Sequence, residues 1–235
     1  MKPTLINLFS DACFRTGAAP FDYQFCWNAD ARGTRRVLTK MRQCGADWFF
    51  SLEALSDALA TGRNQIFLGC GDGYSQVNRG YINALLMKAE PQLQIHVLRM
   101  TDYYLELTNG ALIYFIDPDS NSAALHGNVY VSEYAWADSP KNVIALAKSL
   151  SMHARYHATY YTTPSHNPEA WREYQKLLAT NNTANLIFTA EDAAASDAPL
   201  FDDDCLEQMK KELSAEDWKM MFMCEWPQAD KEPEA

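Results

Sequence analysis

The sequence predicts an α/β fold in which helices flank a mostly parallel sheet and a short helical C-terminal segment follows. Short runs of apolar, β-branched or aromatic residues alternate with amphipathic stretches of helix length. Strands that alternate with helices are typical of βαβ units, whose parallel sheets are buried on both faces. Hydrophobic residues make up 48% of the 235 residues, enough for a sizeable core.

The apolar runs predict strands at about 35–40, 65–70, 94–99, 127–133, 158–163 and 185–190, with helices at about 46–61, 73–89, 139–150 and 167–180. One stretch, at about 104–116, departs from this alternation. Its Asn109-Gly110 stands between two alternating runs, which predicts a hairpin with a type I′ turn.

The C-terminal part of the chain differs in composition. We expect residues 1–200 to form one domain and residues 201–235 a short acidic extension with a frayed tail. Two short helices are predicted there, near 204–213 and 215–224. Asp204 is a candidate cap for the first, and Ser214 for the second, with Asp217 in its first turn.

Acidic residues give the chain a net charge of -10. Residues 191–235 contain 14 of the 30 acidic and 4 of the 20 basic residues, so residues 1–190 carry 16 of each sign. An acidic surface disfavours nonspecific DNA binding by this chain alone. The candidates for a local basic patch are Arg32, Arg35, Arg36, Lys40 and Arg42.

Cysteine usage and the absence of leader features indicate a cytoplasmic protein with reduced thiols. The six cysteines form no C-x-x-C pair and show no zinc-ligand spacing, so neither zinc nor a redox cofactor is expected. Residues 1–14 include Lys2 and Asp11 and lack the apolar run of a signal peptide. No run of about 20 apolar residues predicts a membrane span.

The segment TKMRQCGADWFFSLEAL, at 39–55, is the strongest candidate for a binding site. It follows a predicted strand, contains a glycine and leads directly into a predicted helix. Backbone N–H groups at such a turn cradle phosphates, and a basic side chain meets the outer ones. The pattern G-x-x-x-x-G-K-[ST] is absent, so a plain strand-to-helix turn is the competing interpretation.

Several segments match the motifs of one protein family in the same order. Lys40, Arg42, Gln43 and Gly45 match in register a loop that reads K-S-R-Q-x-G-x-T in that family. The family's adenine-side glutamine motif, acidic strand motif, coupling motif and start of the nuclease domain are similar to FDYQ (21–24), HGNVYVSEYAW (126–136), TYYTTPS (159–165) and MFMCEW (221–226). By these motifs the chain resembles the ATPase domain of the large subunit of tailed-phage DNA terminases.

The resemblance implies a P-loop NTPase-like domain that binds ATP and Mg²⁺. Lys40, Arg42, Gln43, Gly45 and Gln24 would contact the nucleotide. Glu133 would orient the attacking water, and Thr162 and Thr163 would couple hydrolysis to movement. For Gln24, a plain surface side chain is the alternative. For Glu133, the alternative is a carboxylate satisfied by a neighbouring backbone group or by Lys40.

Several positions depart from the family pattern. Asp47 stands where the family has the Mg²⁺-binding threonine, and Ser132 where it has the first acidic residue of the strand. Asp72 replaces a basic residue, and the arginine expected in 117–125 is missing. Because positive charge around the γ-phosphate drives phosphoryl transfer, these changes predict weak or absent hydrolysis.

Other candidates are weaker. His153 and His157 are spaced for one helical face, yet no acidic partner lies nearby, so structural histidines are expected. Asp202, Asp203 and Asp204 favour a solvated helix start over a metal site. Trp218, Phe222 and Trp226 form a stripe that either docks a terminal helix on the core or faces a partner.

Three functions remain open on the sequence. The first is a motor ATPase that drives double-stranded DNA into a capsid as part of an assembly. The second is a nonhydrolysing relative in the cytoplasm of a bacterial host. It binds a small terminase subunit, a portal or a true large subunit, and so assists, redirects or blocks packaging. The third is a prophage remnant that merely folds. No membrane partner is expected.

Overall fold

The computed structural model describes residues 22–28, 35–88, 96–196 and 203–228. They build an eight-stranded sheet in the order β3-β4-β5-β2-β6-β7-β1-β8. The strands are β1 (Arg35–Lys40), β2 (Gln65–Leu68), β3 (Val97–Met100), β4 (Tyr104–Leu107), β5 (Leu112–Ile116), β6 (Asn128–Ser132), β7 (Ala158–Thr162) and β8 (Thr183–Phe188).

The six strands from β5 to β8 in this order pair in parallel, which confirms the predicted mostly parallel sheet. At the other edge, β3 pairs antiparallel with β4, and β4 with β5. The antiparallel edge therefore includes β3 as well as the predicted hairpin.

The hairpin between β4 and β5 has a different turn from the predicted type I′. Only Gly110 has a positive φ, of 86°, whereas a type I′ turn needs two such residues. The Gly110 amide donates to Leu107 O at 2.9 Å, which closes a turn over Thr108 and Asn109. The side chain of Asn109 instead donates to Ala58 O at 2.9 Å, and so ties the hairpin to the helix beneath it.

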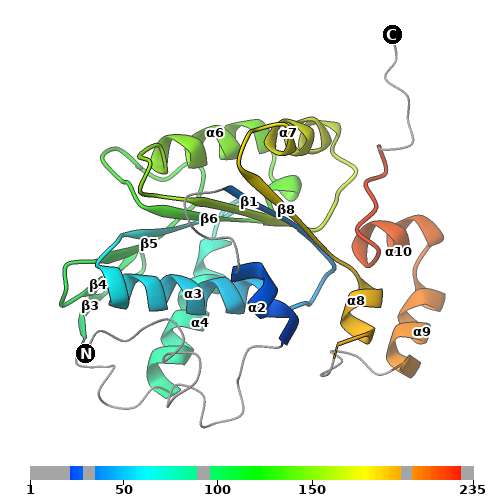
Figure 1. The fold of residues 1–235 in the computed structure, drawn as a ribbon, viewed down its shortest axis with the longest axis horizontal. Coiled ribbons are helices and arrows are strands. Elements are labelled where there is room, and N and C mark those ends of the chain that lie inside the picture. Colours follow the sequence, from blue (N-terminus) through cyan, green and yellow to red (C-terminus); the bar gives the residue numbers. More distant parts are fainter. Residues whose placement is uncertain (1–21, 29–34, 89–95, 197–202, 229–235) are drawn as a thin grey trace.

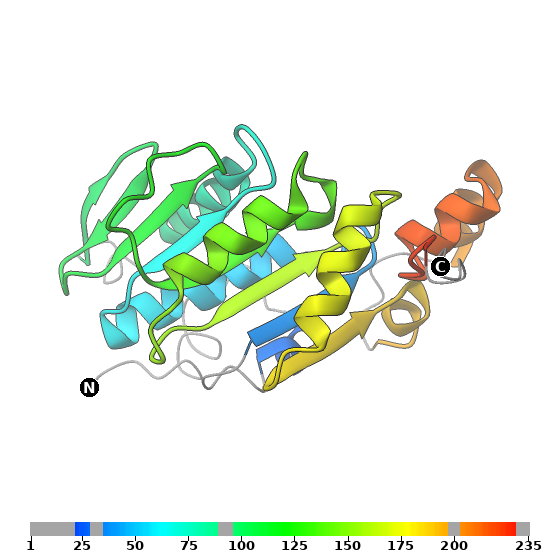
Figure 2. The ribbon, with the colours of Figure 1, turned by 90° about the horizontal axis from the view of Figure 1, so that it is seen from above.

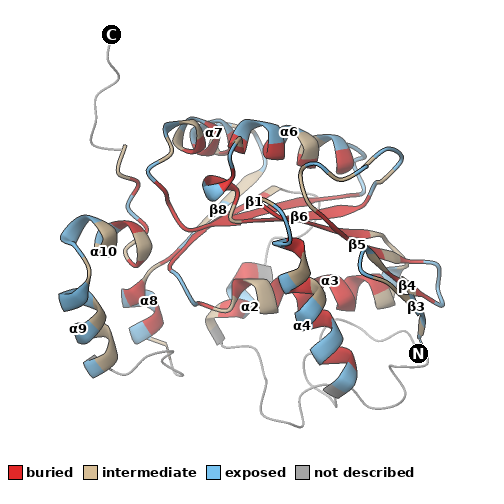
Figure 3. Ribbon diagram, turned by 180° about the vertical axis from the view of Figure 1, so that it is seen from behind, coloured by how far each residue is buried: buried red, intermediate tan, exposed pale blue. Residues whose placement is uncertain are grey.

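Helices cover both faces of the sheet (Figure 1). On one face lie α2 (Asp22–Asn28), α3 (Ala46–Thr61) and α4 (Ser75–Lys88); α6 (Pro140–Leu150) and α7 (Pro168–Leu178) lie on the other, as Figure 2 shows from above. Each face has its own core: Phe49 and Phe50 pack beneath the sheet, and Val143 and Ile144 above it. The central strands are buried throughout (Figure 3), so period-two alternation is absent from their sequence.

The C-terminal helices α8 (Ala190–Ala194), α9 (Asp203–Glu212) and α10 (Ala215–Met221) follow β8 at the edge of the molecule (Figure 1). Ser214 caps α10 as predicted, accepting from the Asp217 amide. Asp204 lies within α9, so its predicted role as the cap is wrong. The predicted boundary at 200/201 lies outside the described residues.

The aromatic stripe divides between the two cores. Trp218 stacks on Phe222 with ring centroids 4.8 Å apart, and Phe222 belongs to the core on the α3 face. Trp226 lies beyond the end of α10 and stacks on Tyr174 at 5.0 Å, on the opposite face of the sheet. The stripe therefore docks the C-terminal segment on the domain.

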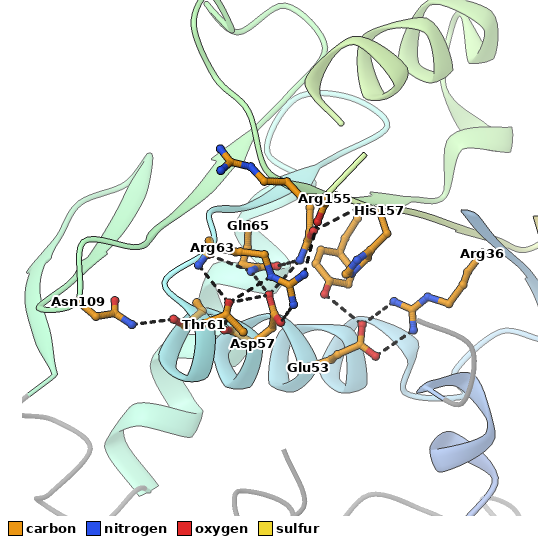
Figure 4. Close-up of polar contacts among 12 residues, drawn as sticks. Arg36, Glu53, Asp57, Thr61, Arg63, Gln65, Asn109, Arg155 and His157 are labelled. Carbon is orange, nitrogen blue, oxygen red and sulfur yellow. Dashed lines mark hydrogen bonds and ion pairs between the residues drawn. The ribbon is translucent and has the colours of Figure 1, made fainter. Parts of the chain in front are cut away.

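A buried polar network joins α3 to the sheet (Figure 4). Arg36 on β1 is 1% exposed and donates to both carboxylate oxygens of Glu53 on α3. Tyr130 on β6 donates to the same carboxylate at 3.1 Å. A second group links Asp57 to Gln65 and Asn128. Paired in this way, the buried charges avoid the several kcal/mol that an isolated buried ion costs, of order 3–5.

Two candidates for the local basic patch are buried. Arg36 and Lys40 are buried, with 1% and 4% of their surface exposed, and each is paired with a carboxylate. Arg35 is half-buried and Arg42 is exposed. Arg32 lies outside the described residues. None of the described helices has the length and apolar character needed to cross a membrane.

Candidate functional site at the carboxyl edge of the sheet

The loop between β1 and α3 turns sharply at the carboxyl edge of the sheet. Gly45, the N-cap of α3, has φ 74° and offers no side-chain cap. Gln43 also has a left-handed backbone, with φ 63°. Such a conformation costs a residue other than glycine about 1–2 kcal/mol. The first turn of a 16-residue helix is thus presented beside Lys40, at the position where α/β folds bind ligands.

Lys40 reaches from the end of β1 to Glu133, which follows β6. The Lys40 Nζ donates to Glu133 Oε1 at 2.5 Å and to Thr163 Oγ1 at 3.2 Å. Burial lowers the pKa of the Lys40 ammonium, but Glu133, Cys44 and Asp47 raise it more, so the net pKa lies above its ordinary value. Lys40 is therefore charged at neutral pH although it is buried.

Glu133 is held in a strained backbone conformation, with φ 50° and ψ 38°. Its second oxygen, Oε2, accepts from the Thr163 amide at 2.8 Å and lies 3.2 Å from Thr162 Oγ1. Residues with such a strained backbone cluster at active sites and ligand clamps. Both coupling residues predicted from sequence, Thr162 and Thr163, thus touch the predicted catalytic carboxylate directly. The two contacts named by the alternative interpretation of Glu133, to Lys40 and to a backbone amide, are both present.

Asp47 and Ser132, two of the three altered positions, meet at this edge. Ser132 Oγ donates to Asp47 Oδ1 at 2.9 Å, and Tyr161 OH donates to the same oxygen at 2.8 Å. Ser132 and Tyr161 are register partners on the parallel strands β6 and β7. Sequence reasoning missed Tyr161, although it falls within the TYYTTPS motif, because a fully buried strand shows no alternation that would reveal which face a side chain takes.

Gln24 on α2 is fully buried, so the alternative of a plain surface side chain is wrong. Its Nε2 donates to Cys44 O at 3.2 Å and lies 3.3 Å from Gly45 O. Tyr23 OH also donates to Cys44 O, at 3.0 Å. These two side chains brace the loop from below. A contact between Gln24 and an adenine base stays a prediction.

Arg42 lies on the exposed side of the loop. Its guanidinium stands over the Trp136 ring, 5.0 Å from the centroid, and the Trp136 Nε1 donates to Thr163 O at 3.0 Å. The Arg42 amide donates to Met221 O at 3.0 Å, and the Met41 amide to Phe188 O at 2.8 Å. The loop is therefore anchored to the ends of both β8 and α10.

Asp72 lies in an exposed turn after β2 and makes no hydrogen bond or ion pair with the described residues. The carboxylate that organises this turn is Asp117, at the end of β5. It accepts from the Gly73 amide at 2.8 Å and from the Ser75 amide at 3.3 Å. Close by, burial and the Glu133 and Asp47 carboxylates raise the pKa of Cys70 to about 12. The turn after β2 thus adjoins the candidate site.

The two histidines behave as structural residues. Burial, together with the Arg36 cation, lowers the pKa of His157 to about 4, so its ring is neutral. His153 is exposed, and its ring packs 6.0 Å from that of Tyr156. Within the described ranges no three His, Cys, Asp or Glu side chains are grouped to hold a metal ion. Asp202 lies outside those ranges, so the expectation for the run Asp202–Asp204 stays a prediction.

The fold and this edge define an α/β domain. Its loop after β1 ends in a glycine, and a lysine contacts a glutamate that follows β6. The chain belongs to the family of terminase large subunits of T4likevirus type, N-terminal part, whose model matches residues 37–232.

Relatives share the sequence or the fold of this chain. The ATPase subunit of the terminase of Escherichia phage P2 is 32% identical over 88% of this chain, which spans only 38% of that relative. The large terminase of bacteriophage HK97 superposes with a TM-score of 0.73 at 11% identity, covering 94% of this chain and 54% of that one. A large terminase from a thermophilic bacteriophage, solved in complex with ADP, gives 0.63 at 14% identity, covering 96% and 54%.

Proposed function

We propose that this chain is the nucleotide-binding module of a phage DNA-packaging ATPase, and that it hydrolyses ATP weakly. The contact between Lys40 and Glu133 carries the proposal. It brings the cation that would meet the outer phosphates and the carboxylate that would orient water to one edge of the sheet, beside a helix N-terminus.

The residues present fit a nucleotide with its Mg²⁺. Lys40 supplies a charged donor, the first turn of α3 supplies a favourable dipole, and Asp47 with Ser132 supplies oxygen ligands. Bound Mg²⁺ would neutralise phosphate charge. The chain's residues would bind the phosphates at Lys40 and receive a proton from water at Glu133. The structure of the thermophilic phage terminase with ADP supports the same class of ligand.

Weak turnover follows from two features. Glu133 already accepts from Lys40 and from the Thr163 amide, so hydrolysis requires these bonds to be exchanged for bonds to the nucleotide. In addition, Asp72 provides no positive charge after β2. A steady-state rate on the order of 1 s⁻¹ that Lys40→Ala or Glu133→Gln abolishes would contradict this part of the proposal.

The satisfied Glu133 also favours a second function, in which the domain acts by binding. In that case the module associates with packaging components, such as a small terminase subunit, a portal or a complete large subunit, and meets double-stranded DNA only in the assembly. The acidic C-terminal segment disfavours DNA binding by the chain alone.

The test is a calorimetric titration of the chain with ATP, with and without Mg²⁺. We expect metal-dependent binding that Lys40→Ala weakens at least about tenfold, which corresponds to about 1.4 kcal/mol. The exposed Lys211→Ala is the matched control and should bind as the parent does. If ATP does not bind and packaging proteins are retained in a pull-down, the binding role replaces the ATPase role.

A further inference from the structure

The carboxylate of Asp47 is held by one oxygen only. Oδ1 accepts from Ser132 Oγ at 2.9 Å and from Tyr161 OH at 2.8 Å. Within the described part of the chain, Oδ2 takes part in no hydrogen bond or ion pair. Asp47 is half-buried, so this second oxygen belongs to a side chain that solvent and ligands reach. The protein therefore fixes Oδ1, and Oδ2 can coordinate a ligand.

The sheet positions the two donors. Ser132 and Tyr161 are register partners on adjacent parallel strands, so their side chains leave the same face of the sheet side by side. Asp47, in the first turn of α3, lies across from both. Tyr161 is fully buried, and its hydroxyl finds its acceptor in this carboxylate. The rotation of the Asp47 carboxylate is thus set by two strands at once.

The backbone around Asp47 is braced as firmly as its side chain. Ser51 Oγ donates to Asp47 O at 2.6 Å, and Asn78 Nδ2 on α4 donates to the same carbonyl at 3.2 Å. The dipole at the start of α3 favours negative charge at this position. The Asp47 carboxylate also belongs to the group of charges that raise the pKa of Lys40, which places it in the electrostatic range of that ammonium.

We propose that Asp47 Oδ2 is the carboxylate ligand for the divalent cation of the bound nucleotide, and that Tyr161 is the positioning residue that aims it. This rests on the proposed nucleotide function. The acid stands in the first turn of α3 and the hydroxyl at the end of β6. The site therefore offers one carboxylate and one hydroxyl.

The donor set suits Mg²⁺ rather than a transition metal. Mg²⁺ bound with a nucleotide takes one or two protein oxygens and fills the rest of its octahedron with phosphate and water. A single carboxylate with a neighbouring hydroxyl is sufficient, so the absence of a three-residue metal cluster among the described residues is consistent with this cation. One negative charge beside the Lys40 cation also limits repulsion of the triphosphate.

The test measures ATP affinity of the full chain in Mg²⁺ and in EDTA, and takes the ratio of the two. Asp47→Asn keeps the acceptor for both hydroxyls but removes the charge. We expect the ratio to fall to about one, because affinity in Mg²⁺ drops while affinity in EDTA is kept or improved. With Mn²⁺ and ADP, the electron paramagnetic resonance signal of bound Mn²⁺ should be lost in the same variant.

Tyr161→Phe tests the positioning role. It should raise the Mg²⁺ concentration needed for half-maximal ATP binding by about three- to tenfold and leave affinity in EDTA unchanged. The matched control is Tyr160→Phe, because Tyr160 is equally buried on the same strand but its hydroxyl contacts no acceptor among the described residues. If both tyrosine variants shift the Mg²⁺ requirement equally, Tyr161 is only structural.

A double variant that interchanges the carboxylate and the hydroxyl distinguishes loss of the site from loss of folding. Ser132→Asp alone should weaken ATP binding, because two carboxylates then face the triphosphate. Adding Asp47→Thr should recover the Mg²⁺ dependence with the two groups interchanged. If the parent binds ATP and Asp47→Asn keeps its full Mg²⁺ dependence, this inference is overturned while the nucleotide function stands. If the parent binds no ATP in either condition, both are overturned.

Discussion

Lys40 and Glu133, 93 residues apart in the sequence, meet at 2.5 Å across the carboxyl edge of the sheet. The Lys40 side chain is 6% exposed and that of Glu133 is 20% exposed, so water screens the pair only in part. The contact joins the end of β1 to the residue after β6, with β7 between them in the sheet. If a ligand drew Lys40 away, the Glu133 carboxylate would keep its contacts with Thr162 and Thr163.

Breaking this pair from one side should destabilise the fold moderately. Lys40→Met leaves Glu133 with its backbone donor, so we expect a loss on the order of 2 kcal/mol, below the 3–5 kcal/mol of fully buried pairs. Urea unfolding gives the value. The double variant Lys40→Met with Glu133→Gln should recover part of the loss, and a double variant that is less stable than either single one would contradict a direct interaction.

A side chain at Gly45 should destabilise the fold, for two separable reasons. A Cβ at Gly45 would lie 2.9 Å from Gln24 Nε2, and its φ of 74° is unfavourable to other residues. Gly73 has a φ of 77° with open space around it, so Gly73→Ala isolates the backbone cost of about 1 kcal/mol. We expect Gly45→Ala to cost more than Gly73→Ala in chemical denaturation. Equal losses would show that Gln24 moves aside freely.

The Arg36–Glu53 pair should contribute strongly to stability. Glu53→Gln leaves a buried guanidinium without its counter-charge, and we expect a loss of about 3–5 kcal/mol. Glu207→Gln, an exposed change on α9, should be close to neutral. Since Arg36 lowers the pKa of Glu53 against the opposing effect of burial, this stabilisation is present above the ordinary carboxyl pKa and declines as pH falls below it.

Protonation of His157 should destabilise the fold at a higher pH than protonation of Glu53 does. Burial and Arg36 lower its pKa from 6.5 to about 4, so the unfolded chain binds a proton that the folded chain does not. Stability is therefore fully present above pH 6.5 and falls as pH drops towards 4, by about 3 kcal/mol in total. Unfolding curves at several pH values should show this slope reduced in His157→Asn and unchanged in the exposed His153→Asn.

Trp136 should report on the loop. Arg42 stands over its ring, a contact worth about 0.5–1 kcal/mol at such exposed positions. Arg42→Ala should alter tryptophan emission with little change in stability. If nucleotide binding repositions Arg42, ATP should change the emission of the parent protein and leave that of Trp136→Phe unchanged. A response that Trp136→Phe retains would come from another tryptophan.

Much of the fold followed from the alternation of strands and helices, which places β1, β6, β7 and the loop after β1 correctly. The turn at Asn109 was mistaken because Asn109 bonds to α3, a contact that local sequence does not encode. Lys40 and Glu133 were candidates from their motifs. Tyr161 was missed because its hydroxyl meets Asp47 across 114 residues. The surface alternative for Gln24 was wrong because α2 docks beneath the loop.

The hydrogen bond from the Arg42 amide to Met221 O has a mechanical consequence. A loop that is tied by its backbone to the last residue of α10 does not change shape by itself. A change in the shape of this loop would therefore move α10, whose Trp218 stacks on Phe222. Residues 222–228, which follow α10, are therefore linked to the loop through this hydrogen bond.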